Sequence, residues 1–299
     1  MNRSRVRLRV SFLLCTLAAV CSFAPAAEPT DSRPRVVADV EYARVADQHL
    51  MLDLHLPDRS AVAPPLVVWV HGGAWRSGSR KDMPLGGLVK RGYAVASVDY
   101  RLSPVARFPA QVHDIKAAIR FLRACQGDYG YDARRIAVAG NSAGGHLAAL
   151  VGVTNGNAEL EGAVGEHPSQ KSDVQAIVSL YGMSNFTTIL AQSTPHGLGV
   201  RVPALQLLLG GQPEQVPELA RLASPVFHVD ASDPPLLLIH GDQDPQAPVN
   251  QSLELDGRYE ALQLPHRLVV LHGSGHGGKE FFNDARCDLM ASFLAEHLK

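Results

Sequence analysis

Hydrophobic and polar positions change their spacing several times along the chain, and each change marks an expected element. Between residues 36 and 56, apolar side chains largely alternate with polar ones on either side of a polar turn at Asp47-Gln48. This period of two predicts an antiparallel edge pair of strands over 36–45 and 49–56. Later apolar runs are continuous, as is typical of strands buried on both faces of a parallel sheet. They predict strands over 66–70, 93–98, 135–140, 174–180, 236–239 and 266–271.

Segments with apolar residues at helical spacing lie between these runs. In the clearest of them, Val112, Ile115, Ile119 and Leu122 share one face of a helix. The same reasoning predicts helices over 83–91, 109–124, 144–153, 249–262 and 283–298. Strand–helix alternation of this length predicts the α/β class, with a mostly parallel sheet of about eight strands and helices on both faces.

The alternation lapses over residues 183–234, where short helices are expected at 202–209 and 217–223. This helical insertion precedes the strand at 236–239 and carries several leucines, Leu205 among them. Long insertions between core strands serve either as lids over a site or as packed connections, and the sequence leaves both alternatives open.

The first residues resemble an export signal. A basic start with Arg3, Arg5, Arg7 and Arg9 precedes the apolar run 11–23 and the small residues of Ala24-Pro25-Ala26. The run is short for a bilayer span, so a retained anchor is disfavoured. We expect a signal peptide over 1–26, with cleavage after Ala26 or Ala27, and a periplasmic or secreted domain over 27–299. Lipid attachment at Cys21 stays open.

Cleavage would remove four arginines and leave 24 basic against 29 acidic residues, a net charge of −5. A mildly acidic chain argues against nucleic acid or an anionic membrane as a partner. Hydrophobic residues make up 46% and charged ones 19% of the sequence, enough to bury a sizeable core. Cys125 and Cys287 would remain, and sequence does not say whether they pair.

The strongest chemical motif is Gly140-Asn141-Ser142-Ala143-Gly144, between a predicted strand and a predicted helix. Gly-x-Ser-x-Gly in this setting is the nucleophile-elbow pattern, in which glycines relieve crowding around a strained serine. The bare pattern also fits an ordinary turn, so the rest of the chain must supply a base, an acid and an oxyanion hole.

Loops after other predicted strands contain these groups. His71-Gly72-Gly73-Ala74-Trp75 follows the strand at 66–70, where exposed backbone N–H groups could bind an oxyanion; a plain glycine turn is the alternative. Asp242 and Asp244 follow the strand at 236–239, and His276 follows the last strand. The order Ser142, acid, His276 is that of the α/β-hydrolase arrangement.

Other polar residues have structural interpretations. For His71, hydrogen bonds within its loop are favoured over catalysis, as are loop-fixing or helix-dipole roles for Asp99 and Asp114. The run Gly273–Gly278 matches Gly-x-Gly-x-x-Gly, but only one helix follows it, so a dinucleotide site is not expected. No zinc-type Cys/His spacing or phosphate-cradling loop occurs in the sequence, and we expect neither a metal nor an organic cofactor.

Together these motifs resemble the α/β-hydrolase superfamily, in the esterase/lipase group near carboxylesterases and feruloyl/acetyl-xylan esterase-like (BD-FAE-like) proteins. The matching segments also include Asp99-Tyr100-Arg101-Leu102. The family pattern places the acid at the last Asp of His-Gly-x-x-Asp, which is Asp244. The resemblance implies a Ser142–Asp244–His276 triad and an oxyanion hole formed by Gly73, Ala74 and Ala143.

The resemblance also implies hydrolysis of a carboxylic ester, small or linked to a polysaccharide, of short-chain, acetyl or feruloyl type. Ala74-Trp75 stands where the hormone-sensitive-lipase branch has a third glycine, which argues against a bulky-ester lipase. Trp75 and Tyr181 are candidate pocket walls, with the protein core as the alternative place for each. A prolyl-type serine peptidase on the same scaffold and a non-catalytic binding protein of this fold remain alternative functions.

Overall fold

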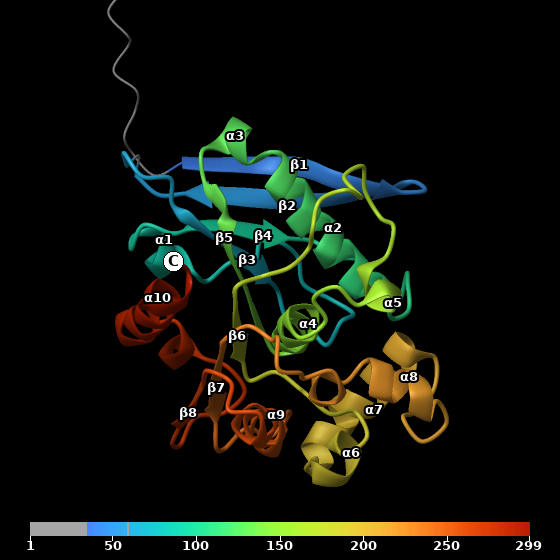
Figure 1. The fold of residues 1–299 in the computed structure, drawn as a ribbon. Coiled ribbons are helices and arrows are strands. Elements are labelled where there is room, and N and C mark those ends of the chain that lie inside the picture. Colours follow the sequence, from blue (N-terminus) through green and yellow to red (C-terminus); the bar gives the residue numbers. More distant parts are fainter. Residues whose placement is uncertain (1–34, 59) are drawn as a thin grey trace, which may run out of the picture. The chain divides into compact units, whose positions relative to one another are not determined.

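One mixed sheet organises the chain. The computed structural model describes residues 35–58 and 60–299. In it, eight strands lie in the order β1-β2-β4-β3-β5-β6-β7-β8, as Figure 1 shows. The strands are β1 (Arg35–Val45), β2 (Gln48–Leu56), β3 (Pro65–Val70), β4 (Ala94–Val98), β5 (Asp132–Asn141), β6 (Ala176–Leu180), β7 (Leu236–Gly241) and β8 (His266–Leu271). β2 pairs antiparallel with both β1 and β4, and the strands from β4 to β8 in the sheet order are parallel. The predicted parallel sheet with an antiparallel edge pair is therefore confirmed.

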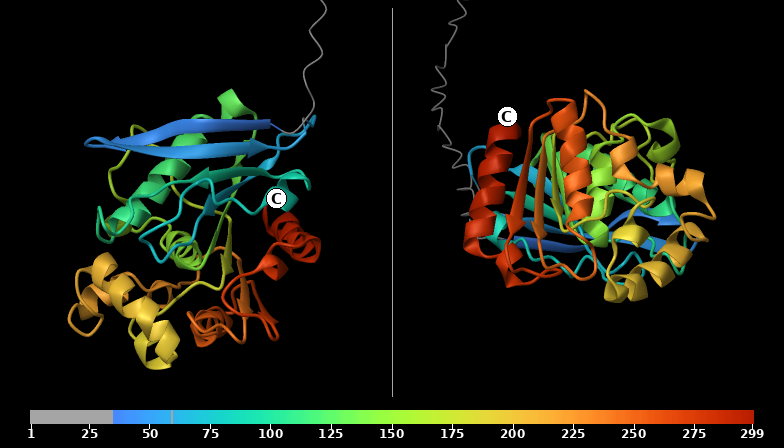
Figure 2. Two further views of the ribbon diagram at one scale, coloured as in Figure 1. Left: turned by 180° about the vertical axis from the view of Figure 1, so that it is seen from behind. Right: turned by 90° about the horizontal axis from the view of Figure 1, so that it is seen from below.

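Helices cover both faces of this sheet (Figure 2). The helices α2 (Ala110–Ala124), α4 (Ala143–Gly152) and α9 (Asn250–Ala261) contribute to one apolar cluster, and α10 (Asp284–His297) contributes to another. Strand β3 shows how the sheet separates the two clusters: Leu66, Val68 and Val70 belong to the first, whereas Val67 and Trp69 belong to the second. Successive side chains of a strand point to opposite faces, so a continuous apolar run serves both layers.

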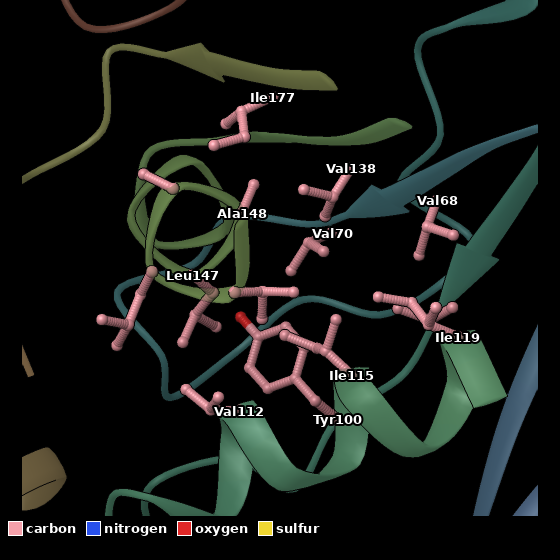
Figure 3. Close-up of a cluster of buried hydrophobic side chains, with 14 of the residues drawn as sticks. Val68, Val70, Tyr100, Val112, Ile115, Ile119, Val138, Leu147, Ala148 and Ile177 are labelled. Carbon is pink, nitrogen blue, oxygen red and sulfur yellow. The ribbon is translucent and has the colours of Figure 1, made fainter. Parts of the chain in front are cut away.

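One part of the core packs α2 and α4 against β3 and β5. Figure 3 shows Ile115 and Ile119 of α2 on one side of this cluster and Val68 and Val138 from the strands on the other. All four are fully buried. Burying each such side chain stabilises the fold by roughly 1.5–3 kcal/mol relative to leaving it exposed. This packing holds β3 and β5 in place, and the loops described below follow these strands.

Two predicted helices differ from those observed. The helix expected at 83–91 is the single turn α1 (Gly86–Val89), which begins at Leu85 without a side-chain cap. A Cβ on Gly87 would lie 2.3 Å from the Cys287 sulfur, so this glycine permits close approach of α10. The helix expected at 202–209 is α7 (Pro195–Leu209), which begins seven residues earlier. Its start is set by Thr194, whose hydroxyl accepts a hydrogen bond from the Gly197 N–H.

The other predicted elements agree with the observed ones to within three residues at each end. Short elements that the pattern did not predict are α3 (Gln126–Tyr129), α5 (Ala158–Glu161), α6 (Ile189–Gln192), η1 (Pro225–Phe227) and η2 (Lys279–Phe281). With α7 and α8 (Pro217–Leu222), α6 and η1 make up the helical segment between β6 and β7. Of its leucines, Leu205 and Leu208 are buried in the core, and Leu207 is 38% exposed.

The predicted signal segment and its cleavage site lie outside the described residues. Within the described part of the chain, no helix is both long and apolar enough to cross a bilayer. Within residues 35–58 and 60–299, Cys125 and Cys287 form no disulfide and are not bonded to each other.

Candidate active site

Ser142 occupies a strained turn between β5 and α4. Its backbone has φ 53° and ψ −119°, a conformation that non-glycine residues rarely adopt. A Cβ on Gly140 would lie 2.2 Å from the Gly144 carbonyl oxygen, and one on Gly144 would lie 2.0 Å from the Val70 carbonyl oxygen. Both glycines are therefore required by the close approach of β3, β5 and α4, and the turn presents the serine beyond the strand end.

A chain of two hydrogen bonds joins Ser142 to His276 and Asp244. The Ser142 Oγ lies 2.7 Å from His276 Nε2, and His276 Nδ1 lies 2.6 Å from an Asp244 carboxylate oxygen. An ionised carboxylate only accepts, so Nδ1 carries the proton and Nε2 of the neutral ring accepts from the serine hydroxyl. The three residues follow β5, β8 and β7, whose carboxyl ends meet at one edge of the sheet.

Several donors hold Asp244 in its charged form. Its second oxygen accepts from the backbone N–H groups of Gln246 and Ala247, each at 2.8 Å. His240 Nε2 lies 3.3 Å from the oxygen that faces His276. Burial opposes ionisation, but the hydrogen bonds from His240 and His276 outweigh it and hold the pKa of Asp244 well below its ordinary value. Asp244 therefore remains an anion that orients the His276 ring.

The competing carboxylate, Asp242, faces a different histidine. It lies 2.8 Å from His272 Nδ1 and accepts a 2.7 Å hydrogen bond from the Gly273 N–H. His272 is 87% exposed at its side chain, so this pair ties two loops at the surface. The choice between the two aspartates that the motif left open is therefore made by geometry, since only Asp244 contacts His276.

The loop after β3 brings backbone N–H groups to the cavity that Ser142 lines. Gly73 and Ala74 have φ values of 109° and 51°, so this loop folds back in the left-handed region. Within residues 35–58 and 60–299, neither of their N–H groups donates a hydrogen bond to the protein. Ala143 is the first residue of α4, where a helix leaves its N–H groups without an internal acceptor. Among the described residues, the N–H groups of all three predicted oxyanion-hole residues thus have no protein acceptor, and Gly73 and Ala74 line the same cavity as Ser142.

His71, Asp99 and Asp114 support loops instead of joining this hydrogen-bond chain. His71 Nδ1 donates to the Gly72 carbonyl at 2.8 Å, and its ring stacks on Tyr100. Asp99 pairs with Arg80 at 2.5 Å, and Asp114 pairs with the Arg101 guanidinium at 2.7 Å. These contacts agree with the structural interpretation of all three residues.

A cavity of about 370 Å³ opens over Ser142 and His276. Tyr181 lines it, packs edge-on against the His276 ring with the ring centres 4.9 Å apart, and accepts a 3.0 Å hydrogen bond from the Asn141 amide. Trp75 does not line it, which corrects the expectation that it would form a pocket wall. Its side chain is fully buried, and its indole N–H donates to His146 Nδ1 at 3.1 Å.

Two residues of this site were not found from sequence. His240 lies at the end of the apolar run of β7 and is fully buried, where it accepts from Ser252 and donates to the Ala247 carbonyl. Arg201 lines the cavity from α7. A polar residue within an otherwise apolar strand or helix was the available signal for both.

No group of three or more potential metal ligands occurs in the part of the chain that the structure describes. The glycine-rich run Gly273–Gly278 forms the loop between β8 and α10 and is followed by no further strand. It therefore lacks the βαβ unit that a dinucleotide site requires, in agreement with the sequence-based interpretation.

Comparison with known proteins agrees with this geometry. The BD-FAE family model matches residues 52–259, most of the described chain. The chain belongs to the BD-FAE family. It is 35% identical to the esterase LipC of Mycobacterium tuberculosis over 71% of this chain and 53% of that protein. It is 32% identical to the isoprenylcysteine alpha-carbonyl methylesterase ICME of Arabidopsis thaliana, over 78% of this chain and 57% of that one.

Among solved structures, a truncated carbohydrate esterase from gut microbiota superposes on this BD-FAE member with a TM-score of 0.80 at 31% identity. The match covers 89% of this chain and 97% of that one. The chain spans about half the length of the first curated relatives that it matches. The predicted α/β-hydrolase fold and the BD-FAE resemblance are confirmed.

Proposed function

We propose that this protein hydrolyses carboxylic esters through an acyl-enzyme formed on Ser142. The observation that carries the proposal is the continuous hydrogen-bond chain from Ser142 Oγ through His276 to Asp244. A serine hydroxyl is a weak nucleophile at neutral pH and needs a base within hydrogen-bond reach, which in turn needs an orienting carboxylate. Esterases among its relatives support the same reaction class.

The steps follow from the positions of these groups. His276 Nε2 takes the hydroxyl proton as Ser142 Oγ bonds to the ester carbonyl carbon. The free N–H groups of Gly73, Ala74 and Ala143 stabilise the oxyanion, and each such donor typically contributes about 3 kcal/mol to the transition state. The imidazolium, steadied by Asp244, then protonates the leaving alcohol. A water molecule, deprotonated by the same histidine, releases the acid and restores Ser142.

We propose esters of short-chain, acetyl or feruloyl type, with a small or polysaccharide-linked alcohol, and the size of the cavity supports the smaller of these acyl groups. At about 370 Å³, the cavity lies at the lower end of the range for small-molecule sites. A second cavity, of about 590 Å³, adjoins it across Gly73, Ser77 and Asn141 and is lined by Trp69, Met83 and Phe282. The two cavities provide separate space for the two halves of an ester.

Hydrolysis of p-nitrophenyl acetate tests the proposal against the peptidase alternative. The wild-type protein should release p-nitrophenol and leave a proline-containing arylamide intact, while Ser142→Ala should lose at least about 10³-fold in kcat. Ser274→Ala is a matched control, because this serine lies in the loop that carries His276. Cleavage of the arylamide, or an active Ser142→Ala variant, would contradict the proposal.

We also propose that the mature protein is exported, on the basis of the basic start, apolar run and small residues over 1–26. Mass spectrometry of the protein recovered from a Gram-negative host, fractionated into cytoplasm and periplasm, tests this. A periplasmic chain beginning at residue 27 or 28 supports export. A full-length cytoplasmic chain contradicts it.

A further inference from the structure

Arg201 brings a positive charge into the catalytic cavity and forms no ion pair within residues 35–58 and 60–299. It extends from α7 and is fully buried, yet it lines the same cavity as Ser142 and His276. Its guanidinium approaches the Met183 sulfur at 3.6 Å, and its Nε is buried with no hydrogen-bond partner in the part of the chain that the structure describes. Burial lowers the pKa of Arg201 to about 10, so it stays protonated at neutral pH.

Arg120 and Arg123 likewise have a buried Nε without a partner among the described residues, but their terminal nitrogens differ from those of Arg201. The guanidinium of Arg123 donates to the carbonyl oxygens of Ala133 and Asp173, and that of Arg120 bonds to Glu161 and to the Val164 carbonyl. Structural arginines of this fold are thus paired with oxygen atoms. A buried charge without such partners is costly, and none of the described residues supplies an oxygen acceptor for Arg201.

A series of buried contacts through Trp75 and His146 holds the Arg201 guanidinium in place. Its carbon lies 5.6 Å from the centre of the Trp75 ring, within the range of a cation–π contact. The Trp75 indole N–H donates to His146 Nδ1, and His146 Nε2 donates to the Ala223 carbonyl at 2.7 Å. Burial lowers the pKa of His146 to about 4, so this ring stays neutral and keeps its acceptor for the indole. The guanidinium is therefore pre-positioned before any ligand arrives.

The charge of the cavity is positive on this side. Arg76 lines the same cavity at its exposed mouth and carries no ion pair within the described residues. The nearby carboxylate, Asp244, acts on Arg201 through space, but its oxygens are engaged by His276, His240 and two backbone N–H groups. An anionic group entering the cavity would meet two cations and no unengaged carboxylate among the lining residues.

We propose that Arg201 binds a carboxylate borne by the ester substrate, so that the enzyme prefers esters carrying an acid group to their neutral equivalents. The planar fork of a guanidinium matches a carboxylate with two parallel hydrogen bonds. Arg76 lies exposed at the entrance, where it attracts the substrate carboxylate with a strength that salt screens. This inference rests on the proposed ester hydrolysis and identifies the substrate class of the same site. The carboxylate belongs either to the acyl half or to the alcohol half of the ester.

Two matched substrate pairs distinguish these halves. Monoethyl glutarate and ethyl pentanoate differ by a carboxylate on the acyl side, whereas p-acetoxybenzoate and p-acetoxybenzamide differ by one on the alcohol side. We expect Arg201→Met to lower kcat/KM for the acidic member of one pair by about 10- to 100-fold, the range of a hydrogen bond to a charged group. The neutral member of that pair should change less than about threefold, and the affected pair identifies the half.

Two further variants separate recognition from folding. Arg201→Lys keeps the charge and should retain part of the preference for the acidic ester, which also tests the inference if Arg201→Met does not fold. Arg221→Met is the matched control, because Arg221 also lies over an aromatic ring, 4.1 Å from the centre of Phe227, but away from the catalytic cavity. It should leave all four rates unchanged.

The outcomes also distinguish this inference from the function on which it rests. If the wild-type protein hydrolyses the neutral esters and Arg201→Met lowers the rates of acidic and neutral members equally, or of neither, carboxylate recognition is wrong and ester hydrolysis stands. If the wild-type protein hydrolyses none of the four and p-nitrophenyl acetate is also untouched, the proposed function itself fails.

Discussion

Gly144→Ala tests whether the nucleophile turn depends on the close approach of two backbones. Gly144 is the second residue of α4, so in an ordinary helix the added methyl would stabilise by up to about 1 kcal/mol. Here the new Cβ would lie 2.0 Å from the Val70 carbonyl oxygen and 2.5 Å from that of His71, where no real Cβ can sit. Both contacts are to backbone atoms at the end of β3, which cannot move aside as a side chain could.

The expected result is destabilisation together with loss of activity. Forcing extra volume into a packed interior costs typically 1–3 kcal/mol, and a clash with two backbone oxygens lies at the upper end of this range. After subtraction of the helix-propensity gain, the net loss should be about 2 kcal/mol, or about 4–8 °C in Tm. Any shift of the Ser142 turn also moves its hydroxyl from His276. Activity should therefore fall more than the fraction of unfolded protein explains.

Urea unfolding and p-nitrophenyl acetate hydrolysis measure the two effects. Gly257→Ala is the matched control, since Gly257 is an exposed residue within α9 and its added Cβ would meet nothing within 4 Å. It should raise the midpoint slightly and leave activity unchanged. If Gly144→Ala behaves like Gly257→Ala, the steric reasoning for the elbow is refuted.

Two other predictions follow from the acid and from a buried histidine. Asp244→Asn should lower kcat about 10³- to 10⁴-fold, because the amide no longer selects the tautomer of His276, while Asp242→Asn should change it less than about threefold; comparable losses in both would contradict the assignment. His146 has a pKa of about 4 when folded and about 6.5 when unfolded, so only the unfolded chain gains its proton as pH falls between these values. This histidine should therefore contribute about 3 kcal/mol of stability at pH 7 that is lost towards pH 4. The urea midpoints of the wild type and His146→Gln should converge as the pH falls from 7 to 4. A difference that stays constant with pH would refute this role of neutral His146.

The sequence predicted most of the sheet, because apolar runs that serve two packed layers leave an unambiguous pattern. The order of glycine motif, acid and histidine also located Ser142 and His276, and the family resemblance selected Asp244 over Asp242. The fold brings these three residues together at one edge of the sheet. The start of α7 was missed, since Gly197, Gly199 and Pro203 lower the apparent helix propensity that tertiary packing overrides. The short length of α1 was missed because Gly87 reflects contact with Cys287, not a local preference.

The surroundings of individual side chains could not be predicted from the periodicity of apolar residues. Trp75 stands in the oxyanion loop, but its positive φ of 59° accompanies burial of the ring in the core instead of exposure to the cavity. Arg201 is separated by 59 positions from Ser142, and nothing in its flanking residues indicates that it faces the serine. Both outcomes depend on how α7 packs over the loop after β3, which is a tertiary property.

Labelling by a fluorophosphonate tests the central claim most directly, because this reagent phosphonylates a serine only when a neighbouring base activates it. Intact-mass analysis of the wild-type protein should show one adduct, and peptide mapping should place it on Ser142. Ser142→Ala should show none, and Asp244→Asn should react more slowly. An unlabelled wild-type protein, or an adduct on another residue, would contradict an activated nucleophile at the end of β5.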